Sequence, residues 1–240
     1  MGYKEYITGK RICFVGACPN IKGKGLGKII DGYDIVVKSG HSWSFNQPDY
    51  FKDYGRRCDV IYVNRQYYRE MKPFPINEMK AKGITWLCLK GISDDDLKRF
   101  DPIVRTRTIR EIFLEVNRVL KSASMGNYII YDLLKWEPAE LYMTGIDFFA
   151  SKNPAFVHDN YQEYLDGYLP PRIREQGNII NVGKMEDGHD FLGNAKYFYN
   201  LFRQHRNFKS DDFILDLLHG IVEGKIRQGD IKWTKEKETS

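Results

Sequence analysis

The chain has 240 residues, of which 42% are hydrophobic and 14% aromatic, so it is long enough to bury one substantial core. Its formal net charge of +5 comes from 37 basic and 32 acidic residues, a mild excess that does not by itself indicate a polyanionic partner. No apolar run approaches the roughly 20 residues that span a bilayer, and the first residues lack the apolar core of a secretory signal. We therefore expect a soluble, cytoplasmic protein without membrane partners.

Short apolar runs alternate with helical patterns along the chain. We expect strands at residues 11–15, 34–38, 59–63, 85–89, 140–144 and 178–182. We expect helices at residues 76–82, 93–100, 108–120, 126–135, 191–204 and 211–223. This alternation predicts a single α/β domain over residues 1–224, Rossmann-like, with a mostly parallel sheet flanked by helices. A polar tail at residues 225–240 follows it.

The most distinctive segment runs from Cys13 to Asp31, where an apolar strand leads into a loop rich in glycine and lysine. Gly23, Gly25 and Gly27 alternate with other residues, so neither the dinucleotide fingerprint nor the P-loop pattern fits. Two interpretations stay open at this point. The loop either cradles a phosphate with its backbone N–H groups or is a tight turn at a strand end.

The cysteines do not predict disulfides or a metal site. Cys13 and Cys88 fall within expected buried strands, and the sequence has no Cys-x-x-Cys pair or histidine cluster. We expect Cys13, Cys18, Cys58 and Cys88 to be reduced structural thiols, and we expect no metal ion and no cofactor.

Three separated segments together resemble the motifs of the eukaryotic-type sialyltransferase family, over about residues 11 to 205. The first, Cys13 to Asn64, resembles the long sialyl motif, with matches at Cys13, Val15, Gly16, Asn20, Gly23, Gly25, Gly27, Asp31, Asp34, Asp53, Gly55 and Arg57. Residues 122–149 resemble the short motif, with matches at Ser124, Gly126, Leu133, Glu140 and Gly145. His158 with Tyr161, and then His189, resemble the two small motifs that follow.

This resemblance implies a metal-independent, inverting glycosyltransferase with a CMP-activated donor and the sialyltransferase-like fold. His189 would be the general base, since a neutral imidazole suits that task near neutral pH. His158 and the Ser124–Gly126 turn would stabilise the leaving phosphate, and Asn20 would contact the nucleotide. The resemblance assigns the remaining donor-site positions to Gly16, Ala17, Lys38, Met125, Gly145 and Tyr161.

The departures from the family pattern fall around the donor. Ala17-Cys18 stand where Asn-Ser is usual, Lys38 and Gly40 replace an Arg and an Asn, and Met125 replaces a Thr. Pro138 replaces the cysteine that would pair with Cys13, and Asn194 replaces a Glu. We therefore expect CMP as the nucleotide and leave the sugar open between sialic acid and a smaller one.

Other questions stay open from the sequence. The acceptor is either a glycan hydroxyl or a hydroxymethylated base in phage-type DNA. The basic residues at 105, 107 and 110 and the stretch 65–69 are compatible with DNA binding, but they are equally typical of an ordinary solvent-exposed surface. A non-catalytic nucleotide-sugar-binding module of the same fold is the alternative to an enzyme. Asp94–Asp96 contains an Asp-x-Asp, which reads better as a helix start than as a metal site. The sequence does not indicate the oligomeric state.

Overall fold

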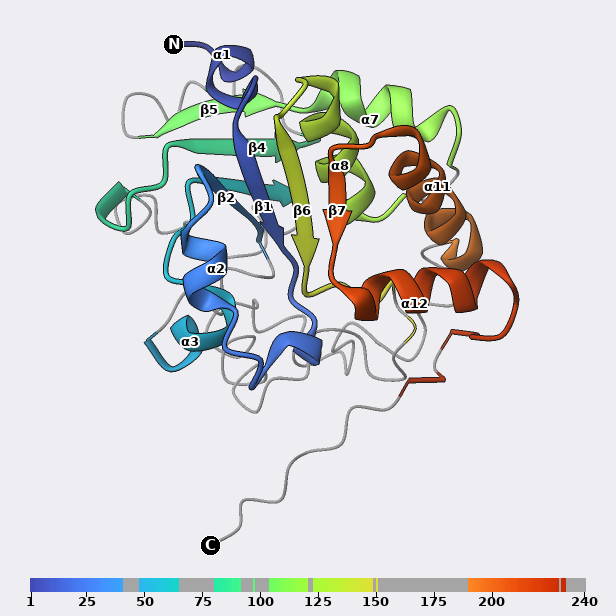
Figure 1. Ribbon diagram of the computed structural model, residues 1–240. Coiled ribbons are helices and arrows are strands. Elements are labelled where there is room, and N and C mark those ends of the chain that lie inside the picture. The colour runs from blue at the N-terminus through green and yellow to red at the C-terminus, as the bar shows by residue number, and fades with distance from the viewer. Residues whose placement is uncertain are drawn as a thin grey trace, which may run out of the picture.

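The computed structural model describes residues 1–40, 48–64, 80–91, 97, 104–120, 123–148, 150, 190–228 and 230–231 (Figure 1). The helices are α1 (Tyr3–Ile7), η1 (Pro19–Ile21), α2 (Gly27–Asp31), η3 (Pro48–Tyr50), α3 (Phe51–Tyr54), α7 (Arg110–Asn117), α8 (Met125–Lys135), α11 (Phe191–Gln204) and α12 (Asp212–Val222). The strands are β1 (Arg11–Val15), β2 (Ile35–Ser39), β3 (Val60–Asn64), β4 (Trp86–Lys90), β5 (Arg105–Thr108), β6 (Glu140–Thr144) and β7 (Phe208–Ser210).

These strands form one seven-stranded sheet in the order β5-β4-β3-β2-β1-β6-β7, and every neighbouring pair is parallel. The expected strands at 11–15 and 140–144 are confirmed to the residue. Strands β2, β3 and β4, expected at 34–38, 59–63 and 85–89, each begin and end one residue later than expected. The expected strand at 178–182 lies outside the described residues. The structure adds β5 and β7 at the two edges of the sheet, and the prediction of an α/β domain with a mostly parallel sheet is confirmed.

Helices cover both faces of the sheet, because alternate side chains of each strand are apolar and point to opposite sides. On β1, Ile12 and Phe14 belong to the core that α7, α8, α11 and α12 cover, whereas Cys13 and Val15 belong to the core under α2 and α3. Figure 1 shows α2 and α3 on one side of the sheet and α7 and α8 on the other. Helices α7, α8, α11 and α12 correspond to the expected helices, and those expected at 76–82 and 93–100 lie largely outside the described residues.

The strand order changes direction between β1 and β6. From β1 the chain builds β2 to β5 on one side, and it then returns to place β6 on the other side of β1. The two strand ends are joined directly, since the Gly16 N–H donates to the Thr144 carbonyl at 2.9 Å and the Cys18 N–H to the Gly145 carbonyl at 2.8 Å. In parallel sheets, ligands bind beyond the carboxyl ends of the strands at such a switch point.

A side chain of Gly16 would collide with the backbone of Gly145, and Gly145 itself has a φ of +71°. Both positions therefore require glycine: Gly16 because the two backbones approach closely, and Gly145 because its backbone is left-handed.

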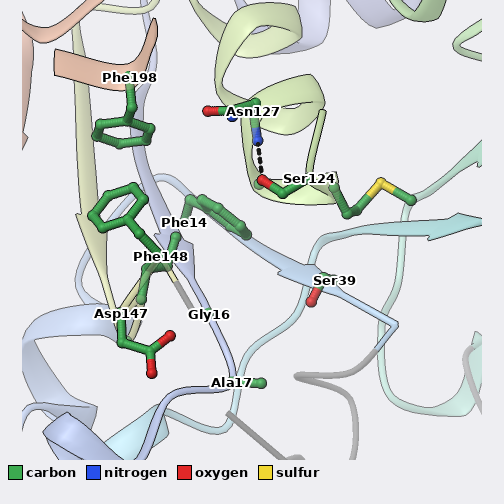
Figure 2. A pocket seen from close by; sticks show the side chains of 13 residues that line it. Phe14, Gly16, Ala17, Ser39, Ser124, Asn127, Asp147, Phe148 and Phe198 are labelled. Atoms are coloured by element: carbon green, nitrogen blue, oxygen red, sulfur yellow. Dashed lines mark hydrogen bonds between the residues drawn. The ribbon is translucent and has the colours of Figure 1, made fainter. Parts of the chain in front are cut away.

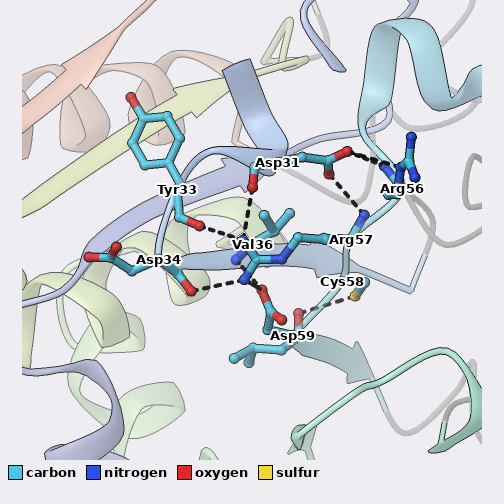
Figure 3. Close-up of polar contacts among 9 residues, drawn as sticks. Asp31, Tyr33, Asp34, Val36, Arg56, Arg57, Cys58 and Asp59 are labelled. Carbon is cyan, nitrogen blue, oxygen red and sulfur yellow. Dashed lines mark hydrogen bonds and ion pairs between the residues drawn. The ribbon is translucent and has the colours of Figure 1, made fainter. Parts of the chain in front are cut away.

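One arginine fixes the turn between α2 and β2 (Figure 3). The Arg57 guanidinium donates to three carbonyls in this turn, those of Asp31 at 2.9 Å, Tyr33 at 2.6 Å and Asp34 at 2.9 Å. It also forms an ion pair with Asp59 at 2.8 Å, and the same carboxylate accepts from the Val36 N–H at 2.7 Å. These residues thus hold the start of β2 in register with β3.

The expected polar tail, residues 225–240, is described only as far as Ile231. Within that stretch Ile226 packs against the core, and the Ile231 N–H donates to the Ala150 carbonyl at 3.0 Å. Within the described ranges, no helix is both long enough and apolar enough to cross a membrane.

Candidate functional site

A pocket of about 110 Å³ lies at the carboxyl ends of β1, β2 and β6, at the switch point of the sheet (Figure 2). This volume is several times what one buried water occupies. The pocket is lined by Phe14, Gly16, Ala17, Ser39, Ser124, Met125, Gly126, Asn127, Gly145, Ile146, Asp147, Phe148 and Phe198. Its walls therefore come from strand ends, from the first turn of α8 and from α11.

The N-terminus of α8 opens onto this pocket. Ser124 is the N-cap, and its hydroxyl accepts from the Asn127 N–H at 3.4 Å. The N–H groups of Met125 and Gly126 have no acceptor among the described residues, as the geometry of a helix start predicts. These two amides, which lack an acceptor within the described ranges, and the positive end of the helix dipole thus meet the pocket, an arrangement that favours an anion.

Asn194 connects α11 to the start of α8. Its side-chain oxygen accepts from the Ser124 N–H at 2.7 Å and from the Asn127 amide at 2.5 Å. Its own amide donates to the carbonyl of Asp190, the N-cap of α11, at 2.6 Å. Asn194 is fully buried, so the residue that replaces the family's expected Glu has a structural role at the edge of the pocket.

A buried carboxylate lies in the same pocket. Asp147 is only 3% exposed, and it follows the end of β6 by three residues. Burial, and then the charge of Asp147, raise the pKa of the Cys18 thiol well above its ordinary value. Cys18 is therefore a protonated and unreactive thiol that interacts with the Asp147 carboxylate.

The structure brings together six of the residues that the sequence assigns to donor binding. The six that line the pocket are Gly16, Ala17, Ser124, Met125, Gly126 and Gly145. They come from two segments more than 100 residues apart, whose first members are Gly16 and Ser124. His158, Tyr161 and His189 lie outside the described residues, and so do Asp94–Asp96 and the stretch 65–69.

Two further assigned residues do not line the pocket. Lys38 is fully buried on the opposite face of β2 from Ser39, and its ammonium donates to the Gly55 carbonyl at 3.1 Å. Burial lowers the pKa of this ammonium. Asn20 is 7% exposed, and its side-chain oxygen has no hydrogen-bond partner among the described residues. Their roles in donor binding stay predictions.

The glycine-rich loop is held by the protein's own carboxylate. Asp53 accepts from the N–H groups of Gly23 and Gly25, both at 2.8 Å. A side chain at Gly27 would collide with the carbonyl of Phe51. Of the two interpretations left open by the sequence, the structure supports the tight turn, because these two amides already have an anionic partner.

Two of the basic residues that left a DNA acceptor open, Arg105 and Arg107, have partners within the fold. Arg107 forms a two-pronged ion pair with Asp132 at 2.8 and 3.2 Å, and its side chain is 17% exposed. Arg105 donates to the Met1 carbonyl at 2.9 Å. Arg107 therefore has a structural role as the partner of Asp132.

Sequence reasoning missed several lining residues. They are Phe14, Ser39, Asn127, Ile146, Asp147, Phe148 and Phe198. For Ser39 and Asp147 the signal was present, since polar residues at the carboxyl end of parallel strands belong to the ligand edge of the sheet. Within the described part of the chain, no three His, Cys, Asp or Glu residues are grouped as metal ligands.

Comparison with known proteins gives a likeness of structure alone. No protein-family model matches the sequence, and no curated protein matches it. Among solved structures, a mammalian sialyltransferase is similar with a TM-score of 0.50 and 14% identity, over 87% of this chain and 71% of that one.

Two other solved structures have lower scores. The sialyltransferase CstII from Campylobacter jejuni, solved with the substrate analogue cytidine-5′-monophosphate, has a TM-score of 0.43 and 13% identity, over 65% of this chain and 75% of that one. A mammalian sialyltransferase in complex with Gal-beta-1-3GalNAc-ortho-nitrophenol has a TM-score of 0.39 and 16% identity, over 60% of this chain and 58% of that one. The first of the three similarities covers most of both chains, and it shows that this chain has a sialyltransferase-like α/β fold.

Proposed function

We propose that this protein is an inverting glycosyltransferase that moves a sugar from a CMP-activated donor to an acceptor hydroxyl. One observation carries the proposal: two distant segments that resemble sialyl motifs line one pocket at the switch point, where the N-terminal amides of a helix meet the pocket. The sialyltransferase-like fold is in keeping with it. The proposal requires no metal ion or cofactor, and we place the enzyme in the cytoplasm, where its free thiols stay reduced.

In the proposed reaction the acceptor oxygen forms a bond to the anomeric carbon of the donor sugar. The bond from that carbon to the phosphate oxygen breaks, and its electron pair leaves with CMP. The amides of Met125 and Gly126 would stabilise the charge that develops on this phosphate. His189 would take the acceptor proton as a neutral imidazole, and His158 would support the leaving phosphate.

The acceptor belongs to one of two classes, a glycan hydroxyl or a hydroxymethylated base in DNA. Both supply a hydroxyl that a general base can deprotonate, so the chemistry at the donor is the same. The internal ion pair of Arg107 removes one of the basic residues that favoured DNA. Mass spectrometry of the glycans and the DNA from cells that express the chain would distinguish the two classes.

The test of the reaction is release of CMP from a panel of CMP-sugars, with His189→Ala as the variant. We expect the wild type to release CMP and the variant to lose at least about a hundredfold in rate, the usual contribution of a general base. His205→Ala is the control, because His205 caps the C-terminus of α11 and does not line the pocket.

Full activity in a folded His189→Ala variant would contradict the assignment of the base. Tight CMP binding without turnover on any donor and acceptor would instead support the alternative, a non-catalytic nucleotide-sugar-binding module.

A further inference from the structure

Besides the start of α8, the carboxylate of Asp147 also lines the pocket. This side chain is 3% exposed and lines the pocket from the loop that follows β6. Burying a charge is costly unless the site offers it partners. A carboxylate can accept about four hydrogen bonds, so a site of this kind accommodates ligand donors as well as protein ones.

The carboxylate and the helix start lie apart within the pocket. In Figure 2 the Asp147 carboxylate is drawn well away from the Ser124 hydroxyl, and both residues line the pocket. The start of α8 attracts an anion, whereas Asp147 repels one and accepts from O–H and N–H groups. A ligand with a phosphate at one end and hydroxyls next to it is therefore bound in one direction only.

The surroundings of Asp147 indicate which end of the donor it meets. Its charge acts on the Cys18 thiol, and the Cys18 N–H donates to the Gly145 carbonyl at 2.8 Å, so the acid adjoins the loop after β1. This loop continues into Asn20, which the sequence assigns to the nucleotide side of the donor. The ring nearest to Asp147 is then the ribose rather than the transferred sugar.

We propose that Asp147 recognises the vicinal hydroxyls of the ribose of the donor nucleotide, with the phosphate held at the start of α8. Asp147 thereby selects a ribonucleotide over a deoxyribonucleotide and sets the direction in which the donor lies. A carboxylate suits this task, because hydrogen bonds to a charged acceptor are about twice as strong as neutral ones. The inference rests on the proposed function, since it requires that the pocket bind a cytidine nucleotide.

The experiment is a calorimetric titration of the full chain with CMP, 2′-deoxy-CMP and 2′,3′-dideoxy-CMP. We expect the wild type to bind CMP about tenfold or more tightly than 2′-deoxy-CMP, and the dideoxy compound more weakly still. In Asp147→Asn the preference for CMP should fall to about threefold, and in Asp147→Ala it should disappear. Glu111→Gln is the control, because Glu111 is an exposed acid on α7 that does not line the pocket.

The outcomes separate the inference from the proposed function. If the wild type binds CMP but discriminates the deoxy compounds by less than twofold, the inference is wrong and the proposed function stands; this comparison needs no variant to fold. If the Asp147→Asn and Asp147→Ala variants keep the full preference for CMP, Asp147 has only a structural role. Failure to bind CMP at all overturns both.

Discussion

At the scale of single residues, many positions that resemble sialyl motifs have one of two roles. Gly16, Ser124, Gly126 and Gly145 line the pocket. Others hold the backbone: Asp31, Asp34, Asp53, Gly55 and Arg57 form the turns next to β1 and β2. Much of the long motif thus builds the scaffold on which the pocket depends and does not contact a ligand itself.

Two glycines in the pocket differ in what a methyl group would meet. In Gly16→Ala the new carbon would collide with the Gly145 backbone, so we expect a loss of unfolding free energy of about 1–3 kcal/mol or more. In Gly126→Ala the nearest atom is the Ser124 hydroxyl oxygen at 3.7 Å, and the higher helix propensity of alanine should stabilise the protein by up to about 1 kcal/mol. Urea unfolding of the two variants measures both effects. Equal stability of the two would show that β1 and β6 do not constrain each other as described.

At the scale of elements, α8 is anchored at its far end by a buried polar cluster. The Asp132 carboxylate on α8 accepts from Arg107 of β5, from Tyr62 of β3 at 2.7 Å and from the indole of Trp136 at 3.0 Å. The Tyr62 hydroxyl is in turn bonded to that of Tyr3 at 2.5 Å. The cluster joins α1, β3, β5 and α8, and so it helps to fix where the N-terminus of α8 meets the pocket.

Removing one partner of this cluster should be costly. In Arg107→Met the fully buried Asp132 carboxylate loses its cation, and we expect a loss of about 3–5 kcal/mol in unfolding free energy. The control is Lys135→Met, which breaks the ion pair between α8 and Glu115 of α7. Those two side chains are 32% and 33% exposed, so the expected loss is only about 0–1 kcal/mol.

A further change distinguishes the charge from the packing of Arg107. Adding Asp132→Asn to Arg107→Met removes the unpaired charge, and part of the lost stability should return. If the double variant is no more stable than Arg107→Met, lost packing over the Tyr3 ring, which lies 4.1 Å from the guanidinium, accounts for the effect.

The central strands and the packed helices were predictable because their apolar patterns are strong. Strands 11–15 and 140–144 and helix 191–204 match to the residue. The edge strands were missed for physical reasons: β5 has the polar sequence Arg-Thr-Arg-Thr, and β7 has only three residues. Both strands form because they pair with a neighbouring strand of the sheet, and no local sequence pattern indicates such pairing.

The pocket was predictable only in part. The resemblance pointed to backbone positions such as Gly16 and Gly145. Asp147 could have been found from its place after a parallel strand, whereas no sequence pattern indicates that Asn127 lines the pocket. Lys38 was assigned to the donor site because it stands where the resemblance expects an Arg. Side chains alternate along a strand, so Lys38 lies on the opposite face of β2 from Ser39, and it is fully buried there.

At the scale of the whole molecule, the four cysteines are free and buried, as the sequence led us to expect. Burial raises the pKa of Cys58 to about 12 and that of Cys88 to about 12, and it raises those of Cys13 and Cys18 as well. Thiols in the unfolded chain ionise near pH 8.5. Above that pH the folded state therefore holds more protons than the unfolded state, and stability falls as pH rises.

We expect each buried thiol to reduce the unfolding free energy by about 1.4 kcal/mol per pH unit above roughly pH 9. Urea unfolding under reducing conditions at pH 7.5, about 9 and about 10 measures the slope. Cys88→Ala should lower the slope by one such increment, whatever its effect on stability at neutral pH. The opposite contribution of Lys38, whose pKa is lowered, is common to both proteins and cancels in the comparison. An unchanged slope would contradict the burial of this thiol.

The contact between Gly16 and Gly145 also limits how this protein can change over evolutionary time. The floor of the pocket is bare backbone from two strands, so no substitution there can add a side chain without separating the strands. New ligand preferences must therefore arise on the walls, at positions such as Ala17, Ser39 and Ile146. A library that varies the walls and keeps the two glycines searches the substitutions that the fold can accept.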